Sequence, residues 1–163
     1  MTDARTPEVI DGVLCTAGHF NDPRTLYCSV CGISMLQQTA RIVRRPRPPL
    51  GVLVWDDGAS TSVDSGMVMG REPGVHPLVT DAGLAPHVVD DPTIESSRVH
   101  LAVRPSGWDV TVVDLGSSNG TSIVRGSTGS VEALRPEQPV VLRDSDTVRF
   151  GSRSFVFRSH HRV

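Results

Sequence analysis

The chain has 163 residues, with 16 basic and 18 acidic side chains and a formal net charge of −2 at pH 7. A charge this close to neutrality excludes proteins that hold nucleic acid or an anionic membrane surface by bulk charge. The length allows one ordinary domain and one smaller domain. Any binding partner must therefore be sought through local motifs.

Two further features of the sequence concern location and source. No apolar run approaches the roughly 18 residues of a spanning helix, and residues 1–11 carry acids where a secretion signal would carry bases. We therefore expect a cytoplasmic protein with no membrane partner. All 16 basic residues are arginine, a bias that codon usage in a GC-rich genome produces, so we expect a bacterial source.

All three cysteines lie within the first 31 residues, and His19 lies among them in the spacing C-x3-H-x8-C-x2-C. Residues 28–32, Cys-Ser-Val-Cys-Gly, resemble a zinc knuckle. Three thiolates and one imidazole suit tetrahedral zinc, and a closed set of four ligands indicates a structural site. We predict that one structural Zn2+ ion organises a zinc-ribbon-like module over residues 1–36. The predicted ligands are Cys15, His19, Cys28 and Cys31.

The alternative for this segment is three unrelated free cysteines, or one disulfide with an odd thiol left over. A cytoplasmic chain disfavours a disulfide, and a segment of about 20 residues with few apolar groups cannot fold by burial alone. Both considerations favour zinc.

Residues 37–49 are predicted to form a Pro/Arg linker, because the Arg-Arg-Pro-Arg-Pro-Pro run lacks backbone donors and favours extended polyproline II. Arginines 41, 44, 45 and 47 could contact nucleic acid or an acidic partner. No helical face or interleaved aromatic residues gather them into a platform, so solvated linker charge is the favoured interpretation.

From residue 50 onward, short β-rich runs alternate with Gly, Pro, Asp and Ser, and no convincing amphipathic helix appears. About eleven strands are predicted in residues 50–163, which indicates an all-β sandwich. Residues 72–95 are expected to form a surface loop that could widen or partly cover a binding site. The predicted strands are 50–55, 61–63, 67–70, 87–89, 99–104, 108–114, 121–124, 131–134, 140–143, 147–150 and 155–158.

Two polar motifs flank a predicted hairpin over residues 99–114. Ser97-Arg98-Val99-His100 leads into its first strand, and Leu115-Gly116-Ser117-Ser118-Asn119-Gly120-Thr121 follows its second. Because the strands are antiparallel, both motifs lie at the same end of the sheet and can converge on one ligand. A third motif, Gly70-Arg71, ends an earlier apolar run.

Gly-Arg, Ser-x-x-His and Asn-Gly-Thr, in this order, resemble the forkhead-associated (FHA) domain, a phosphothreonine-reading β-sandwich. The resemblance covers residues 50–158 and implies the same strand count. It implies that the phosphate is bound by Arg71 and Ser97, with a hydroxyl from Ser118, and that the peptide backbone is held by Asn119 and Arg98. It gives structural roles to Gly70, His100, Gly120 and Thr121.

Taken singly, each of these residues is also explained by ordinary turn chemistry or by a surface arginine. An enzyme alternative exists as well, because residues 116–120 fit the G-x-S-x-G nucleophile pattern, with Asp144, Asp146, His160 and His161 later in the chain. That pattern requires a helix directly after the serine, and residues 121–130 are rich in helix breakers and β-branched residues. We therefore expect no enzyme activity.

The sequence thus predicts a phosphothreonine-dependent adaptor of Ser/Thr kinase signalling. Its partner is a Thr-phosphorylated protein, and its zinc module serves a second protein interaction. The alternative is a nucleic-acid-associated regulator that uses the zinc module and the arginine linker.

Overall fold

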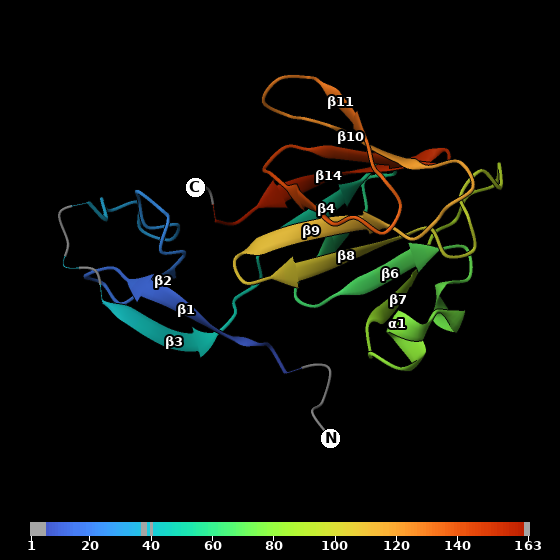
Figure 1. Ribbon diagram of the computed structural model, residues 1–163. Coiled ribbons are helices and arrows are strands. Elements are labelled where there is room, and N and C mark those ends of the chain that lie inside the picture. Colours follow the sequence, from blue (N-terminus) through green and yellow to red (C-terminus); the bar gives the residue numbers. More distant parts are fainter. Residues whose placement is uncertain (1–5, 37–38, 40, 162–163) are drawn as a thin grey trace.

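Almost all regular structure in this chain is β-strand, as the alternation of apolar and polar residues predicted. The computed structural model describes residues 6–36, 39 and 41–161. It places a small three-stranded sheet beside a sandwich of two larger sheets (Figure 1). Within the described residues, no helix has both the length and the apolar character needed to cross a membrane.

The sandwich contains all eleven predicted strands, which confirms the predicted fold class. One sheet has the order β11-β10-β13-β14-β4-β5 and the other β12-β9-β8-β6-β7. All neighbouring strands in them pair antiparallel except β6 and β7, which are parallel. The strands are β4 (Gly51–Trp55), β5 (Ser60–Ser62), β6 (Met67–Gly70), β7 (Ala85–Val88), β8 (Leu101–Ser106), β9 (Asp109–Asp114), β10 (Thr121–Val124), β11 (Val131–Ala133), β12 (Val140–Leu142), β13 (Thr147–Phe150) and β14 (Arg153–Ser159).

The core lies between these two sheets, because every second side chain of a strand points to the same face. Leu101 and Val103 of β8 and Val110 and Val112 of β9 are buried there, together with Phe150 at the end of β13. The core residues come from both sheets and form one cluster. Both ends of the β8–β9 hairpin are thereby held on a fixed scaffold.

The segment after Gly70 covers the outer face of the second sheet. Residues predicted as a surface loop contain a 3-10 turn, η1 (Pro73–Val75), and one short helix, α1 (Pro77–Thr80), so the loop prediction was wrong there. Leu78, Val79 and Leu84 pack against Val68 and Ala102 on the outer face of β6 and β8. The segment 78–84 therefore shields apolar side chains that the sheet would otherwise expose to water.

The N-terminal sheet has the order β2-β1-β3, with β1 (Val9–Leu14), β2 (Phe20–Asn21) and β3 (Ile42–Pro46). Strand β3 lies inside the segment predicted as a polyproline-like spacer, so that conformation was wrong for residues 42–46. Two β-branched residues open β3, and Pro46 is tolerated because β3 is an edge strand. The small sheet therefore includes residues from both sides of the cysteine segment.

The tip of the β8–β9 hairpin faces the N-terminal sheet (Figure 1), and side chains on both sides make contact there. The Trp108 indole donates to the Asp11 carbonyl oxygen at 2.7 Å, and its ring lies 5.0 Å from the Phe20 ring and 4.9 Å from the His161 ring, centroid to centroid. Arg24 forms an ion pair with Asp109 at 2.8 Å. A groove of about 590 Å³ opens beside these residues. The two parts are thus in direct contact through polar and aromatic groups.

Candidate functional site

Two loops meet at the sandwich end opposite the Trp108 tip, and buried His100 joins them. Its Nδ1 accepts a hydrogen bond from the Ser97 backbone N–H at 2.9 Å, and its Nε2 lies 2.9 Å from the Gly120 carbonyl oxygen. With Nδ1 as acceptor, the neutral ring donates from Nε2. Burial lowers the pKa of His100, although the Gly120 carbonyl and Asp114 oppose this shift. The neutral ring therefore holds the 97–100 loop against the 117–120 loop.

Asp114, at the end of β9, organises the second loop. Its carboxylate accepts hydrogen bonds from the backbone N–H groups of Gly116 and Ser117, both at 2.9 Å, and from the Ser117 and Thr121 hydroxyls, both at 2.6 Å. Burial alone would raise the pKa of Asp114, but these hydrogen bonds outweigh it and lower the pKa. Gly120 has a φ of +80°, which glycine adopts readily. The 117–120 turn is thus fixed from within.

The polar groups of the 97–100 and 117–120 loops come together at this end of the sandwich, which we call the rim. The Ser118 backbone N–H donates to the Ser97 hydroxyl oxygen at 3.0 Å, and the Asn119 amide donates to the Glu95 carbonyl oxygen at 2.7 Å. A groove of about 430 Å³ adjoins Asn119 and is also lined by Glu95, Arg149 and Gly151. The rim therefore has a polar groove beside Asn119.

The Arg71 guanidinium lies at the rim because Gly70, which precedes it, lets β6 approach the 97–98 backbone closely. A Cβ atom on Gly70 would clash with the Arg98 carbonyl oxygen, so only glycine lets β6 approach the 97–98 backbone. The Arg71 backbone N–H then donates to the Ser97 carbonyl oxygen at 3.2 Å, and its Nε donates to the Ser96 carbonyl oxygen at 2.8 Å. The two terminal amino groups of Arg71 make no hydrogen bond to any residue that the structure describes.

The structure brings Arg71, Ser97, Ser118 and Asn119 together at one rim, as expected from their motifs. The Arg98 side chain is exposed and has no polar contact within the described residues, although the Arg98 carbonyl oxygen accepts from the Glu72 N–H at 2.8 Å. Two aspartates that the sequence analysis did not single out also support the rim. Asp91 accepts a hydrogen bond from the Ser96 N–H at 2.7 Å, and Asp114 accepts one from the Ser117 N–H at 2.9 Å. Asp114 ends the strand that leads into the second motif, and this position was the signal available for it.

Residues 67–151, slightly more than half of the chain, match the family model of the FHA domain. The chain belongs to the FHA domain family. Comparison with curated protein sequences gives no match. Three solved structures illustrate the structural similarity of this FHA protein to others.

EmbR of Mycobacterium tuberculosis, solved in complex with a low-affinity phosphopeptide, is 22% identical with a TM-score of 0.51, over 72% of this chain and 26% of EmbR. That likeness supports the fold. A structure from a study of phosphothreonine-dependent FHA domain interactions is 26% identical over 67% of this chain and 95% of its own, with a TM-score of 0.45. The FHA domain of an Arabidopsis thaliana protein is 25% identical over 68% and 86% of the two chains, with a TM-score of 0.49.

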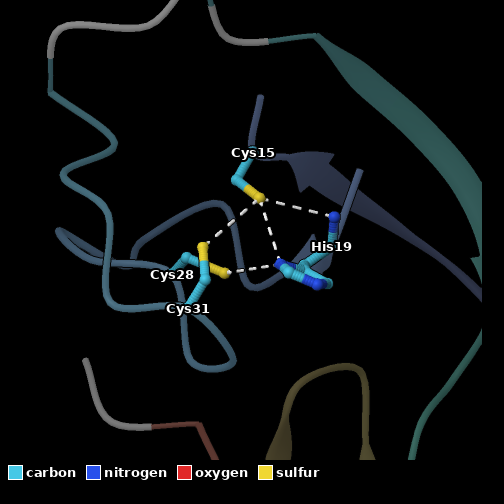
Figure 2. A group of neighbouring side chains, drawn as sticks. All are labelled: Cys15, His19, Cys28 and Cys31. Atoms are coloured by element: carbon cyan, nitrogen blue, oxygen red, sulfur yellow. Dashed lines mark hydrogen bonds between the residues drawn. The ribbon is translucent and has the colours of Figure 1, made fainter. Parts of the chain in front are cut away.

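A second candidate site lies in the N-terminal module, where the four predicted ligands cluster (Figure 2). The Cys15 and Cys31 sulfur atoms are 3.9 Å apart, and His19 Nδ1 lies 3.4 Å from the Cys15 sulfur and 3.6 Å from that of Cys28. All four ligand atoms lie within 4.8 Å of one another. Cys15 follows β1 and His19 precedes β2, while the other two come from the 28–32 turn. This cluster could hold a metal ion.

Asn21, fully buried, supports the cluster and was not predicted. Its amide donates to the Cys28 sulfur at 3.4 Å and to the His19 carbonyl oxygen at 3.0 Å, while its oxygen accepts from the Ser29 N–H at 2.8 Å. Burial would raise the pKa of Cys28, but backbone hydrogen bonds from Cys31 and Val30 and the Asn21 amide lower it to about 6. The site therefore favours the thiolate, the form that binds metals.

Two of the linker arginines are engaged with acids of the same module. Arg44 lies 3.2 Å from an Asp11 carboxylate oxygen, and Arg47 lies 2.9 Å from a Glu8 carboxylate oxygen. Arg47 also donates its backbone N–H to the Glu8 carbonyl oxygen at 2.7 Å. Because Arg44 and Arg47 are already paired with acids, these contacts disfavour a nucleic-acid-binding surface built from the linker arginines.

The hydrolase pattern at residues 116–120 lacks its required context. The segment after Ser118 enters strand β10 without a helix, and Asp146 pairs with Arg125 at 2.7 Å. Ser118 uses its backbone N–H to contact Ser97, and His100 contacts the Ser97 backbone and the Gly120 carbonyl. Of the later partners that the pattern would need, Asp146 is paired with Arg125, and His161 packs against Trp108 at the opposite end of the sandwich.

Proposed function

We propose that the FHA domain of this chain binds a phosphothreonine segment of a partner protein at the rim. The observation that carries this proposal is the convergence of Arg71, Ser97 and Ser118 from two loops and a strand end. A phosphoryl group carries about −1.5 to −2 charges and three acceptor oxygens, which matches a permanent cation beside fixed hydrogen-bond donors.

The hydrogen bonds already present define which donors stay free for the phosphate. Ser97 Oγ accepts from the Ser118 N–H, so the Ser97 hydroxyl proton is available to donate. Arg71 uses Nε for the Ser96 carbonyl oxygen, so its terminal amino groups are available. The Ser118 hydroxyl supplies a third donor. We assign phosphate binding to these three side chains.

Asn119 and Arg98 are proposed to hold the peptide backbone on either side of the phosphothreonine. The Asn119 side chain is already oriented by its 2.7 Å hydrogen bond to the Glu95 carbonyl oxygen, which leaves its own oxygen to accept a peptide N–H. The solved EmbR complex contains a phosphopeptide, the ligand class proposed for this FHA domain. The chain then acts as a noncatalytic adaptor in Ser/Thr kinase signalling.

We further propose that the N-terminal module is zinc-ribbon-like and holds one structural Zn2+ ion through Cys15, His19, Cys28 and Cys31. Tetrahedral zinc bonds of about 2.3 Å to sulfur and about 2.0 Å to nitrogen place two sulfurs about 3.8 Å apart, and sulfur and nitrogen about 3.5 Å apart. The observed 3.9 Å, 3.4 Å and 3.6 Å separations fit these values. When bound, zinc would crosslink a module with little core of its own. The module is proposed to bind a second protein.

An oriented peptide library, probed with the full chain, tests the phosphopeptide assignment. We expect enrichment of phosphothreonine peptides over phosphoserine peptides, because the extra γ-methyl group adds about 1 kcal/mol of apolar contact. Unphosphorylated peptides of the same sequences serve as the control. Equal retention of phosphorylated and unphosphorylated peptides would reject the assignment.

A further inference from the structure

Asp91, in the loop between β7 and β8, is a buried carboxylate that contacts no residue of the three motifs directly. Only 5% of its surface is exposed. One of its oxygens accepts from the Thr93 N–H at 3.1 Å and from the Thr93 and Ser152 hydroxyls, both at 2.6 Å. The other accepts from the Ser96 N–H at 2.7 Å. These donors satisfy the buried charge without a cation.

Ser96 connects this carboxylate to the rim cation. Its N–H donates to Asp91, while its carbonyl oxygen accepts from Arg71 Nε at 2.8 Å. The Ser96 residue is thus held on one side by Asp91, and it fixes the guanidinium on the other side. Because Nε is engaged, the plane of the guanidinium is set and its terminal amino groups keep one direction.

The turn between β13 and β14 holds Asp91 from a distant part of the chain. Ser152 supplies one of the hydroxyl donors from a position 61 residues away. A Cβ atom on the neighbouring Gly151 would lie 2.5 Å from the Ser96 nitrogen and 2.7 Å from an Asp91 carboxylate oxygen, and Gly151 has a φ of +56°. This close approach requires glycine and ties the loop to the sandwich.

We propose that Asp91 is a positioning residue that orients Arg71 for phosphate through the backbone of Ser96. The proposal rests on the proposed phosphothreonine function. Asp91 does not touch the ligand. It acts by removing rotational freedom from Arg71 before the ligand arrives, which lowers the entropy cost of binding.

Asp91→Asn tests the proposal, because an amide replaces one carboxylate oxygen with a donor that faces other donors. We expect phosphothreonine peptide affinity of the full chain to fall about 10-fold, the effect of one lost charged hydrogen bond. Asp90→Asn, an exposed neighbour, is the matched control and should bind as wild type. Ser152→Ala is a milder variant that should weaken binding about 3-fold without loss of fold.

A double-mutant cycle separates positioning from general destabilisation. Arg71→Lys keeps the charge but lacks Nε, so Asp91→Asn should cost less than about 2-fold in that background. If Asp91→Asn lowers peptide affinity equally in the wild-type and Arg71→Lys backgrounds, the proposal is overturned. It is also overturned if neither Asp91→Asn nor Ser152→Ala lowers the affinity.

The NMR signal of Arg71 Nε–H in the free protein gives a readout that needs no ligand. We expect it to be protected from hydrogen exchange in wild type and to exchange in Asp91→Asn as fast as that of exposed Arg98. Unchanged protection in the variant would contradict the positioning role. If the wild-type chain binds no phosphothreonine peptide, the proposed function fails, while this exchange measurement still decides whether Asp91 orients Arg71.

Discussion

The Ser97 backbone N–H donates to the buried Nδ1 of His100 at 2.9 Å. The first residue of the Ser-x-x-His motif is therefore held by the last. The same imidazole reaches the Gly120 carbonyl oxygen through Nε2. One neutral side chain therefore sets the spacing of the two rim loops. Protonation of Nδ1 would replace an acceptor with a donor that faces the Ser97 N–H.

This geometry predicts how stability depends on pH. The pKa of His100 is lowered in the folded state by burial, so the unfolded chain takes up the proton first as the pH falls. The contribution to stability is fully present above the ordinary pKa of about 6.5 and declines below it, toward the folded-state pKa. We expect the urea-unfolding free energy of wild type to fall between pH 7 and pH 5 more steeply than that of His100→Gln.

His87 and His161 also have lowered pKa values, caused first by burial, and they contribute to the slope in both proteins. The difference between wild type and His100→Gln removes their share. Parallel pH profiles for the two proteins would contradict the assigned role of His100.

Gly70 is predicted to be intolerant of any side chain. Gly70→Ala places a Cβ atom against the Arg98 carbonyl, and backbone on both sides cannot move aside cheaply. We expect a loss of about 2 kcal/mol in unfolding free energy, within the range for overpacked sites. Gly74→Ala, where a Cβ atom meets nothing within 4 Å, is the control and should cost far less. Equal stability of the two variants would show that β6 does not require the close approach.

If the proposed zinc site is correct, the protein carries one zinc ion per chain after purification under reducing conditions without chelator. Cys28→Ser should lose the ion, because it removes a buried ligand, whereas Thr16→Ala, an exposed neighbour of Cys15, should retain it. Elemental analysis gives the stoichiometry. A metal-free wild-type protein, or a Cys28→Ser variant with an equally ordered module, would refute zinc binding.

Loss of the metal should also release the module from the sandwich. Phe20 adjoins the proposed ligand His19, and its ring contacts the Trp108 ring. Ser29 adjoins the proposed ligand Cys28, and its Oγ lies 3.3 Å from His161 Nδ1. We expect chelation to shift the tryptophan emission of wild type to longer wavelength and to increase the radius of gyration in X-ray scattering. Trp108→Phe, which keeps a ring but loses the Asp11 hydrogen bond, should lack the emission shift. A radius that chelation leaves unchanged would contradict metal-dependent docking.

The eleven sandwich strands could be predicted because their signals are local. Alternating residues such as those of 109–114, bounded by Gly and Asp turns, identify a half-buried strand without knowledge of its partner. The Cys and His spacing and the three rim motifs are equally local. The convergence of the Ser97 and Asn119 motifs followed from the antiparallel hairpin, since these two motifs flank the same two strands. The place of Gly70-Arg71 at the rim depends instead on the pairing of β6 with β8.

The features missed from the sequence depend on distant contacts. Strand β3 forms because β1, more than 25 residues earlier, offers a free edge to a Pro/Arg segment. The helix α1 is favoured by the apolar outer face of β6 and β8, which no local pattern reveals. In the sequence, Asp91 cannot be distinguished from any other loop aspartate, because its partner Ser152 lies 61 residues away. Trp108 likewise gives no sign that its indole N–H donates a hydrogen bond to the Asp11 carbonyl oxygen, 97 residues away.

Calorimetric titration of the full chain with one threonine peptide, phosphorylated and unphosphorylated, tests the phosphate-site assignment most directly when wild type is compared with Arg71→Ala. The account predicts that only the phosphorylated peptide binds wild type and that Arg71→Ala lowers its affinity at least about 10-fold, because one charge-assisted hydrogen bond contributes about 1.5 to 3 kcal/mol. Arg104→Ala, an exposed arginine in β8 near the opposite end, should bind as wild type. Affinity no better than millimolar for every phosphothreonine peptide, or equal affinity of Arg71→Ala and wild type, would contradict the assignment.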